Sequence, residues 1–360
     1  MREMPRDVSV LRIYESVRTM HVEQLHHMIP GHLIYRDHMY DWHFDDGTVP
    51  YPMHRASRPS IARAILGMRS GTVELNEPLM IRAWPTLLVT ALALTTAKTV
   101  LRRPIVVSAY AIENNPPVPA VASYTHLPTA WVRWPTTAMI RLLCRSLDRI
   151  AFGTPAAERN LRTFAATSLP RDVMTMLELP TPCPVCLLRK ERIVVALGEF
   201  SHRKGILHTM AAWDQLPVGH GLRLVMIGMG PLTDRVLRWA DPRMDVDVLV
   251  DPPRQRIHDV LARARTLVLL STSSARWREQ IGLPITEGLA HGCEIVSTAD
   301  TGFAPWLADH GHRIVESAAS ADVAGAIMDS TAGPDRAEDI TTPLPDEDTR
   351  VTIDRWMHRR

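Results

Sequence analysis

Apolar runs alternate regularly with amphipathic segments in the second half of the chain. Short runs rich in β-branched residues predict buried strands, and the segments between them have the three-to-four-residue apolar spacing of helices. The predicted strands span residues 192–198, 222–228, 246–250, 266–271 and 293–297. The predicted helices span 204–216, 231–239, 255–264 and 283–291. This alternation indicates right-handed βαβ units and a doubly wound parallel sheet.

The first half has a weaker pattern. Two β-branched or apolar runs, 103–109 and 147–153, predict buried strands. The apolar stretch 85–97 falls short of the roughly 20 residues that span a bilayer, so it predicts a buried core helix instead.

Residues 130–145 predict a basic amphipathic helix that carries Trp131, Trp134 and three arginines. Such a helix lies on an anionic membrane surface, or it packs on its own sheet with the arginines facing water. Both interpretations stay open.

Three prolines between residues 179 and 186 indicate an extended linker, because proline removes backbone donors that helices and central strands need. We therefore predict a first domain at 1–182 and a second at 183–330. Cys183 and Cys186 form a CxxC pair inside this linker. With no second cysteine pair to complete a zinc site, packing of the linker is the favoured interpretation.

Composition narrows the function classes. The 360 residues are 46% hydrophobic and 22% charged with a net charge of +2, which argues against a disordered acidic tail and a nucleic-acid binder. The four cysteines are too few for a disulfide scaffold. The charged start without an apolar run predicts no signal peptide and a cytoplasmic protein.

Seven histidines fall within the first 54 residues, without a recognisable metal-ligand spacing. They are His21, His26, His27, His32, His38, His43 and His54. A polar loop region is favoured over a metal centre, and no metal site is predicted anywhere in the chain.

The loops after the predicted strands are the places to look for a ligand, since doubly wound sheets bind at the carboxyl ends of their strands. The first loop has Gly198, Arg203 and Lys204 before a helix, which favours either a phosphate cradle or a solvated basic turn. The second loop has Gly228 and Gly230, whose lack of a side chain lets a backbone approach a ligand closely.

The loop after the strand at 266–271 contains two carboxylates eight residues apart, Glu279 and Glu287. Converging near a helix N-terminus, they would accept hydrogen bonds from the hydroxyls of a polyol. The alternative for Glu287, placed in the first helical turn, is simple complementarity to the helix dipole.

Together these loops resemble the C-terminal domain of retaining GT-B glycosyltransferases of glycosyltransferase family 4, the group 1 transferases. The resemblance covers residues 192–315 and is strongest from Glu279 to Gly292. It implies two Rossmann-like doubly wound domains with an interdomain cleft. It also implies that Glu279 contacts the donor sugar and Glu287 the ribose.

The resemblance further implies that the loop containing Ile281, Gly282 and Leu283 contacts the donor diphosphate through backbone amides. Lys204, with these amides, would offset the charge that develops on the leaving diphosphate. The chain departs from the family pattern at Glu199, which stands where the family usually has arginine, and Arg203 is a candidate replacement.

In the first domain, the family's acceptor-side histidine is absent from residues 109–116. Glu113 is the favoured polar candidate there, ahead of Tyr110 and Asn114. Residues 331–360 form either a helix that returns to the first domain, as in many GT-B chains, or a frayed terminus.

The expected activity is hexosyl transfer, with retention, from a nucleotide diphosphate sugar to a glycan, lipid-linked or small-molecule acceptor. The sugar nucleotide is a substrate, and no cofactor is expected. Contact with the inner face of a membrane stays open. The alternatives are an epimerase or hydrolase on the same fold, and a degenerate, non-catalytic protein that binds a sugar nucleotide or a partner protein.

Overall fold

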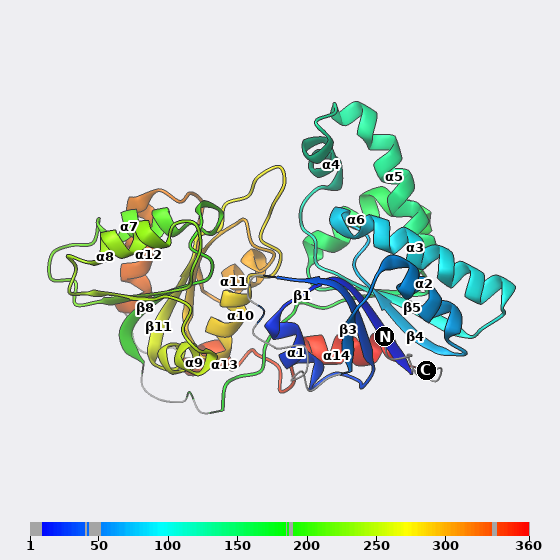
Figure 1. The fold of residues 1–360 in the computed structure, drawn as a ribbon. Coiled ribbons are helices and arrows are strands. Elements are labelled where there is room, and N and C mark those ends of the chain that lie inside the picture. Colours follow the sequence, from blue (N-terminus) through cyan, green and yellow to red (C-terminus); the bar gives the residue numbers. More distant parts are fainter. Residues whose placement is uncertain are drawn as a thin grey trace. The chain divides into compact units, whose positions relative to one another are not determined.

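The computed structural model describes residues 9–39, 42, 52–184, 186, 190–332 and 337–359. It separates into two compact units, one comprising Met1–Leu177 and Thr349–Arg360 and the other Glu178–Asp348. Each unit has a wholly parallel sheet with helices packed against it (Figure 1). The predicted fold of two Rossmann-like doubly wound domains is confirmed.

The second unit has the strand order β10-β9-β8-β11-β12-β13, so its switch point lies between β8 and β11. The strands are β8 (Glu191–Leu197), β9 (Arg223–Ile227), β10 (Val246–Leu249), β11 (Ala264–Leu269), β12 (Glu294–Thr298) and β13 (Arg313–Val315). The helices are η4 (His202–Lys204), α7 (Ile206–Trp213), α8 (Thr233–Ala240), α9 (Arg254–Arg263), α10 (Leu283–Ala290), α11 (Ala304–Asp309), α12 (Ser320–Ala332) and α13 (Ala337–Thr341). Every strand and helix predicted in this half is present.

The first unit repeats this arrangement with the order β3-β2-β1-β4-β5-β6-β7. Its strands are β1 (Val10–Val17), β2 (His32–His38), β3 (Met53–Arg55), β4 (Gly71–Leu75), β5 (Ile105–Ala111), β6 (Arg149–Phe152) and β7 (Asp172–Thr175). Its main helices are α1 (Thr19–Leu25), α2 (Arg58–Gly67), α3 (Trp84–Thr95), α4 (Pro117–Thr125), α5 (Thr129–Arg145), α6 (Pro155–Ala165) and α14 (Thr349–His358). Short helical turns are η1 (Ile81–Ala83), η2 (Thr96–Val100) and η3 (Ala166–Ser168).

The apolar stretch at 85–97 is the core of α3, whose Leu87, Ala91 and Leu94 are buried against the first sheet. The prediction of a buried core helix is confirmed. Among the described residues, no helix has the length and apolar character needed to cross a membrane.

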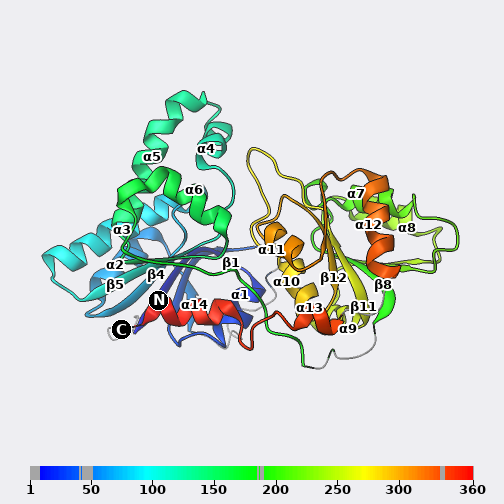
Figure 2. The same cartoon turned by 180° about the vertical axis from the view of Figure 1, so that it is seen from behind.

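The unit boundaries differ from the predicted ones. The chain leaves the first unit after Leu177 rather than after residue 182, and residues up to Asp348, not 330, stay with the second unit. Only α14 joins the first unit, where it packs on β5 and β6 (Figure 2).

A buried ion network attaches α14 to the first sheet. Arg12 on β1 contacts Glu74 on β4 at 3.1 Å and Asp354 on α14 at 2.6 Å, and all three side chains are at most 1% exposed. Arg350 and His358, also on α14, contact Glu74 at 2.9 and 3.2 Å. Burial alone would raise the pKa of Glu74, but Arg350, His358 and Arg12 hold it below its usual range.

The buried ion network predicts a large loss of stability when one of its carboxylates is removed. Replacing Asp354 by Asn leaves the Arg12 charge buried beside one carboxylate instead of two, and should lower the free energy of unfolding by about 3 kcal/mol or more. Urea denaturation followed by circular dichroism measures this. Arg162→Gln, which breaks the exposed Arg162–Glu158 pair of the same unit, is the control and should cost less than about 1 kcal/mol. Equal effects of the two variants would contradict the prediction.

Candidate functional site

The loops that follow β8, β9 and β11 meet at the switch point of the second sheet and are joined by backbone hydrogen bonds. The Gly198 amide donates to the Ile227 carbonyl at 2.9 Å, and the Phe200 amide donates to that of Met229 at 3.0 Å. The Thr272 amide, after β11, donates to the Arg203 carbonyl at 3.0 Å. The three loops singled out from the sequence therefore form one connected surface.

Glycine is required where these loops touch. A Cβ on Gly228 would lie 1.9 Å from the Gly198 carbonyl oxygen, and a Cβ on Gly230 would lie 2.7 Å from that of Phe200. Both glycines are therefore explained by the packing of one loop on another, whereas the sequence analysis ascribed them to close approach of a ligand. Gly205, which caps α7 with φ of +71°, is equally constrained by the Leu270 carbonyl, 2.1 Å from a Cβ.

Lys204 and Glu279 form the polar centre of the surface. The Lys204 ammonium donates to Glu279 Oε2 at 2.5 Å, and the Ser271 hydroxyl donates to the same oxygen at 2.7 Å. Glu279 is 7% exposed. Trp277 lies beneath the cations of this loop, with its ring 5.4 Å from Lys204 Nζ. Lys204 and Glu279, both predicted to contact a sugar-nucleotide donor, are thus in direct contact. Ser271 and Trp277 contact them and were not predicted.

Glu199 stands where the family usually has arginine, and it forms a salt bridge within its own loop. Arg203 contacts its carboxylate at 2.6 Å across one helical turn, and the guanidinium stacks 4.7 Å from the Trp277 ring. The Glu199 charge is therefore compensated within the loop. Arg203, the predicted replacement for the family's arginine, is thus paired with Glu199, and its contact with a donor stays a prediction.

The loop after β11 ends at the N-terminus of α10. Ile281 is 4% exposed, and Gly282 caps the helix in the left-handed region with φ of +76°. Leu283 opens the helix and Pro284 follows in its first turn. The first N–H groups of a helix have no partner within it and attract anions. The predicted diphosphate loop therefore presents the positive end of α10.

Glu287 is the fifth residue of α10, and the first turn holds no acidic residue. Its predicted place in the first turn was wrong, which removes dipole complementarity as its explanation. Arg254, at the start of α9, donates to Glu287 Oε1 at 2.7 Å. The other oxygen, Oε2, is buried and accepts no hydrogen bond from a described residue. A buried carboxylate oxygen with no described donor is uncommon in folded proteins, which makes Glu287 a candidate contact for a hydrogen-bonding ligand.

The loop after β12 supports the one after β11. The Asp300 carboxylate accepts hydrogen bonds from the Ser273 amide and hydroxyl at 2.8 and 2.9 Å. The Gly302 amide donates to the Gln280 carbonyl at 3.0 Å, beside Glu279. Neither Asp300 nor Arg254 was among the predicted site residues. Their signal was available, since both follow strands at the carboxyl edge of the sheet.

In the first unit, Glu113 lies just after β5, and its backbone amide contacts the carboxylate of Glu77, which follows β4. The Glu113 amide donates to Glu77 Oε1 and Oε2 at 3.0 and 2.9 Å. Burial, and then the nearby Glu113 charge, raise the pKa of Glu77 well above its usual range. Tyr110 belongs to β5 rather than to the loop, and Arg350 stacks 4.3 Å from its ring.

The N-terminal histidines do not gather into a metal site within the described ranges. His21 accepts a hydrogen bond from the Arg18 amide at 3.1 Å, and burial lowers its pKa to about 4. His38 stacks on Trp42 with the ring centroids 6.0 Å apart. His43 lies outside the described residues.

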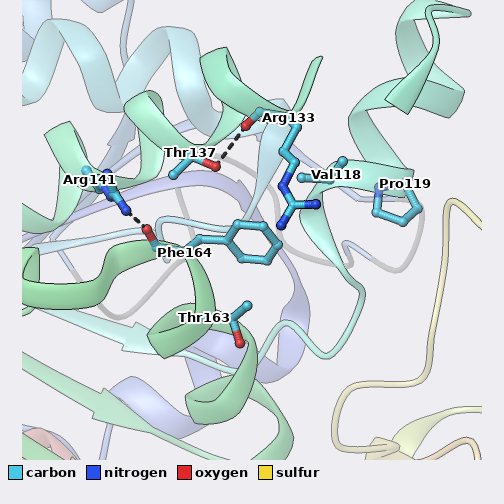
Figure 3. Close-up of a pocket in the computed structure, with 7 residues that line it drawn as sticks. All are labelled: Val118, Pro119, Arg133, Thr137, Arg141, Thr163 and Phe164. Atoms are coloured by element: carbon cyan, nitrogen blue, oxygen red, sulfur yellow. Dashed lines mark hydrogen bonds between the residues drawn. The ribbon is translucent and has the colours of Figure 1, made fainter. Parts of the chain in front are cut away.

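A cavity of about 420 Å³ opens between α4, α5 and α6 of the first unit. The side chains of Arg133 and Phe164 point toward one another across it, and Arg141 donates to the Phe164 carbonyl at 3.1 Å (Figure 3). Beside it, α5 exposes Trp131 and Trp134, at 72% and 78% of their surfaces.

Residues 187–342 match the family model described as Glycosyl transferases group 1. This part of the chain is similar to the group 1 glycosyltransferases. The match covers every loop of the candidate site in the second unit, confirms the predicted resemblance, and identifies the chain as a transferase. No curated protein matches the chain at a significant level.

Solved structures share the fold over nearly the whole chain. WaaG, a glycosyltransferase involved in lipopolysaccharide biosynthesis, is 12% identical with a TM-score of 0.62, covering 98% of this chain and 100% of its own. Anabaena HepE in complex with UDP-glucose is 12% identical with a TM-score of 0.60, covering 97% and 98%. A UDP-forming trehalose-phosphate synthase from Burkholderia xenovorans is 12% identical with a TM-score of 0.61, covering 97% of each.

The loop contacts predict a strong effect at Gly205. Gly205→Ala places a methyl group against the Leu270 carbonyl in a left-handed conformation, and should lower the free energy of unfolding by more than about 1 kcal/mol. Gly325→Ala, in α12 with open space around it, is the control and should raise that free energy by up to about 1 kcal/mol. Urea denaturation measures both, and a neutral Gly205→Ala would refute the proposed loop constraint.

Proposed function

We propose that the chain is a retaining glycosyltransferase that moves a sugar from a nucleotide diphosphate sugar to an acceptor. The observation that carries this proposal is the buried, unpartnered Oε2 of Glu287 within the part of the chain that matches the group 1 model. A ribose hydroxyl is a donor of the kind that this oxygen lacks. No cofactor enters the proposal, because the sugar nucleotide is itself the substrate.

The proposed roles follow the geometry of the loops. Glu287 accepts from the ribose, and Glu279 accepts from donor sugar hydroxyls while Lys204 and Ser271 hold its orientation. The N–H groups at Gly282 and Leu283 and the Lys204 ammonium stabilise the charge that grows on the leaving diphosphate. These groups are in place before the reaction, so little reorganisation is needed.

The charge balance of the site is the strongest argument for the non-catalytic alternative. Lys204 is paired with Glu279, and Arg203 with Glu199, so these four side chains carry no net charge. The attraction for a diphosphate then comes mainly from the N-terminus of α10. We propose that this suffices for binding, and a nucleotide titration distinguishes the two functions.

The acceptor side of the proposal involves the first unit. We propose that Glu113 contacts the acceptor and that the acceptor is lipid-linked, with α5 resting on an anionic membrane surface at the cytoplasmic face. Exposed Trp131 and Trp134 support this, because tryptophan favours the membrane interface. The arginines of α5 supply attraction to anionic lipids.

Glu287→Gln tests the donor site. Loss of a charge-assisted hydrogen bond to ribose should weaken binding of UDP-glucose or of another sugar nucleotide by about 10- to 100-fold. Isothermal titration of the parent and the variant with UDP-, GDP- and ADP-sugars measures this. Glu191→Gln, at an exposed pair with Arg263 in the same unit, is the control and should bind like the parent.

The outcomes separate the alternatives. A ligand that binds the parent and loses affinity in Glu287→Gln supports the ribose role, whereas equal affinity contradicts it. No binding of any sugar nucleotide by the parent favours the non-catalytic protein. Turnover of the donor without an acceptor would instead indicate an epimerase or hydrolase.

Replacing Trp131 and Trp134 by Ser tests the membrane contact. The double variant should lose most of its co-sedimentation with phosphatidylglycerol vesicles, because its interfacial anchors are gone. Met244→Ser, at a fully exposed residue of the second unit, is the control and should sediment like the parent. Equal sedimentation of parent and double variant, or none for the parent, would contradict a membrane role for α5.

A further inference from the structure

The CxxC pair of the linker meets a histidine that is distant in sequence. The Cys186 sulfur lies 3.0 Å from the Cys183 sulfur and 2.8 Å from Nδ1 of His291, the residue that ends α10. Cys186 and His291 are 6% and 3% exposed. One ligand atom from each of the three residues lies within 4.8 Å of the others.

Two thiols and an imidazole are the donor set that zinc prefers in proteins. A tetrahedral Zn²⁺ with bonds of about 2.3 Å to sulfur holds two sulfurs about 3.8 Å apart. The present sulfur–sulfur separation of 3.0 Å therefore needs to widen by less than about 1 Å, which rotation of the Cys side chains provides.

His291 has a hydrogen-bonding partner of the kind that usually orients a metal-binding histidine. Nε2 of His291 lies 2.9 Å from Nδ1 of His258 on α9, so the ring nitrogen that faces away from the thiols has a partner that fixes its orientation. Lys190 is buried and donates to the carbonyls of Ala262 at 2.8 Å and of His291. The positive charge of Lys190 does not oppose metal binding, because a Zn²⁺ ion with two thiolate ligands carries no net charge and does not repel it.

Cys293 lies two residues beyond His291, and its thiol contacts the Ala264 carbonyl at 3.4 Å. A three-ligand site leaves the fourth tetrahedral position to a water molecule, since Cys293 does not belong to the group whose ligand atoms lie within 4.8 Å of one another.

We propose that Cys183, Cys186 and His291 bind a zinc ion, oriented through His258. The ion fastens the segment before β8 to the C-terminal end of α10, the helix whose other end forms the candidate donor site. A hydrogen bond already joins these parts, from the Cys183 amide to the Ala290 carbonyl at 2.7 Å.

Reversible disulfide formation is the competing use of a CxxC pair, and the geometry favours the metal. A redox-active cysteine is accessible to its reaction partners. Cys186 is buried and offers little access to an attacking thiol. A disulfide would not explain why His291 and its partner His258 lie beside the thiols, whereas a metal ion would, because histidine is a zinc ligand.

Cobalt titration of the full chain tests the site without any variant. The protein is reduced, stripped with a chelator, assayed for free thiols and titrated with Co²⁺. We expect the visible bands of tetrahedral cobalt, a thiolate-to-cobalt charge-transfer band in the near ultraviolet, and loss of both on adding about one equivalent of Zn²⁺. Weak bands of octahedral cobalt without charge transfer would overturn the proposal.

Variants then identify the ligands. Cys186→Ala and His291→Ala should lose the zinc found by elemental analysis, and His258→Ala should bind zinc about 10- to 100-fold more weakly. Cys144→Ala, which removes a buried cysteine of the first unit, is the matched control and should retain the metal. Parental zinc affinity in His291→Ala, or an equal loss in Cys144→Ala, would overturn the assignment. These readouts are independent of sugar-nucleotide binding.

Discussion

The candidate donor site depends on how closely three loops approach one another at the switch point of the second sheet. The carbonyl of Leu270 occupies the space of any side chain at position 205, and the carbonyl of Gly198 does the same at position 228. With glycine at both positions, the ends of β8, β9 and β11 come within hydrogen-bonding distance. Lys204 and Glu279, 75 residues apart in sequence, then meet.

Charge compensation is the second organising feature of this surface. Glu199, Glu279 and Glu287 each have a basic partner, namely Arg203, Lys204 and Arg254. Since each carboxylate is neutralised locally, the acidic residue at position 199 is compatible with an anionic ligand. The orientation of the glutamates is also set before any ligand arrives, which lowers the entropy lost on binding.

The second unit was predictable because its strands are buried on both faces and read as unbroken apolar runs, as in residues 193–197. The strands β1 and β4 were missed because Arg12 and Glu74 interrupt their apolar pattern. These charges are buried because Arg12 and Glu74 pair with each other across 62 residues and with side chains of α14, and no local pattern reveals such pairings.

Long-range pairing also limited what could be predicted of the sites. Lys204, Glu279 and Gly282 lie in loops that follow predicted strands, so their meeting at one edge of the sheet could be predicted. The meeting of Cys186 with His291, 105 residues away, depends on where the linker runs beside α10. The place of Arg254 after a strand could be predicted, but its pairing with Glu287, 33 residues away, could not be read from spacing along the chain.

The attachment of α14 has a consequence for how the chain folds during synthesis. Arg12 and Glu74 pair with each other, but each has a further buried partner on α14, Asp354 and Arg350 respectively, and α14 is made after the second unit. The second unit, complete at Asp348, needs none of them. The first unit is translated before the second but completes its native packing only after α14 has been made, so its two buried ionic groups lack part of their pairing until then.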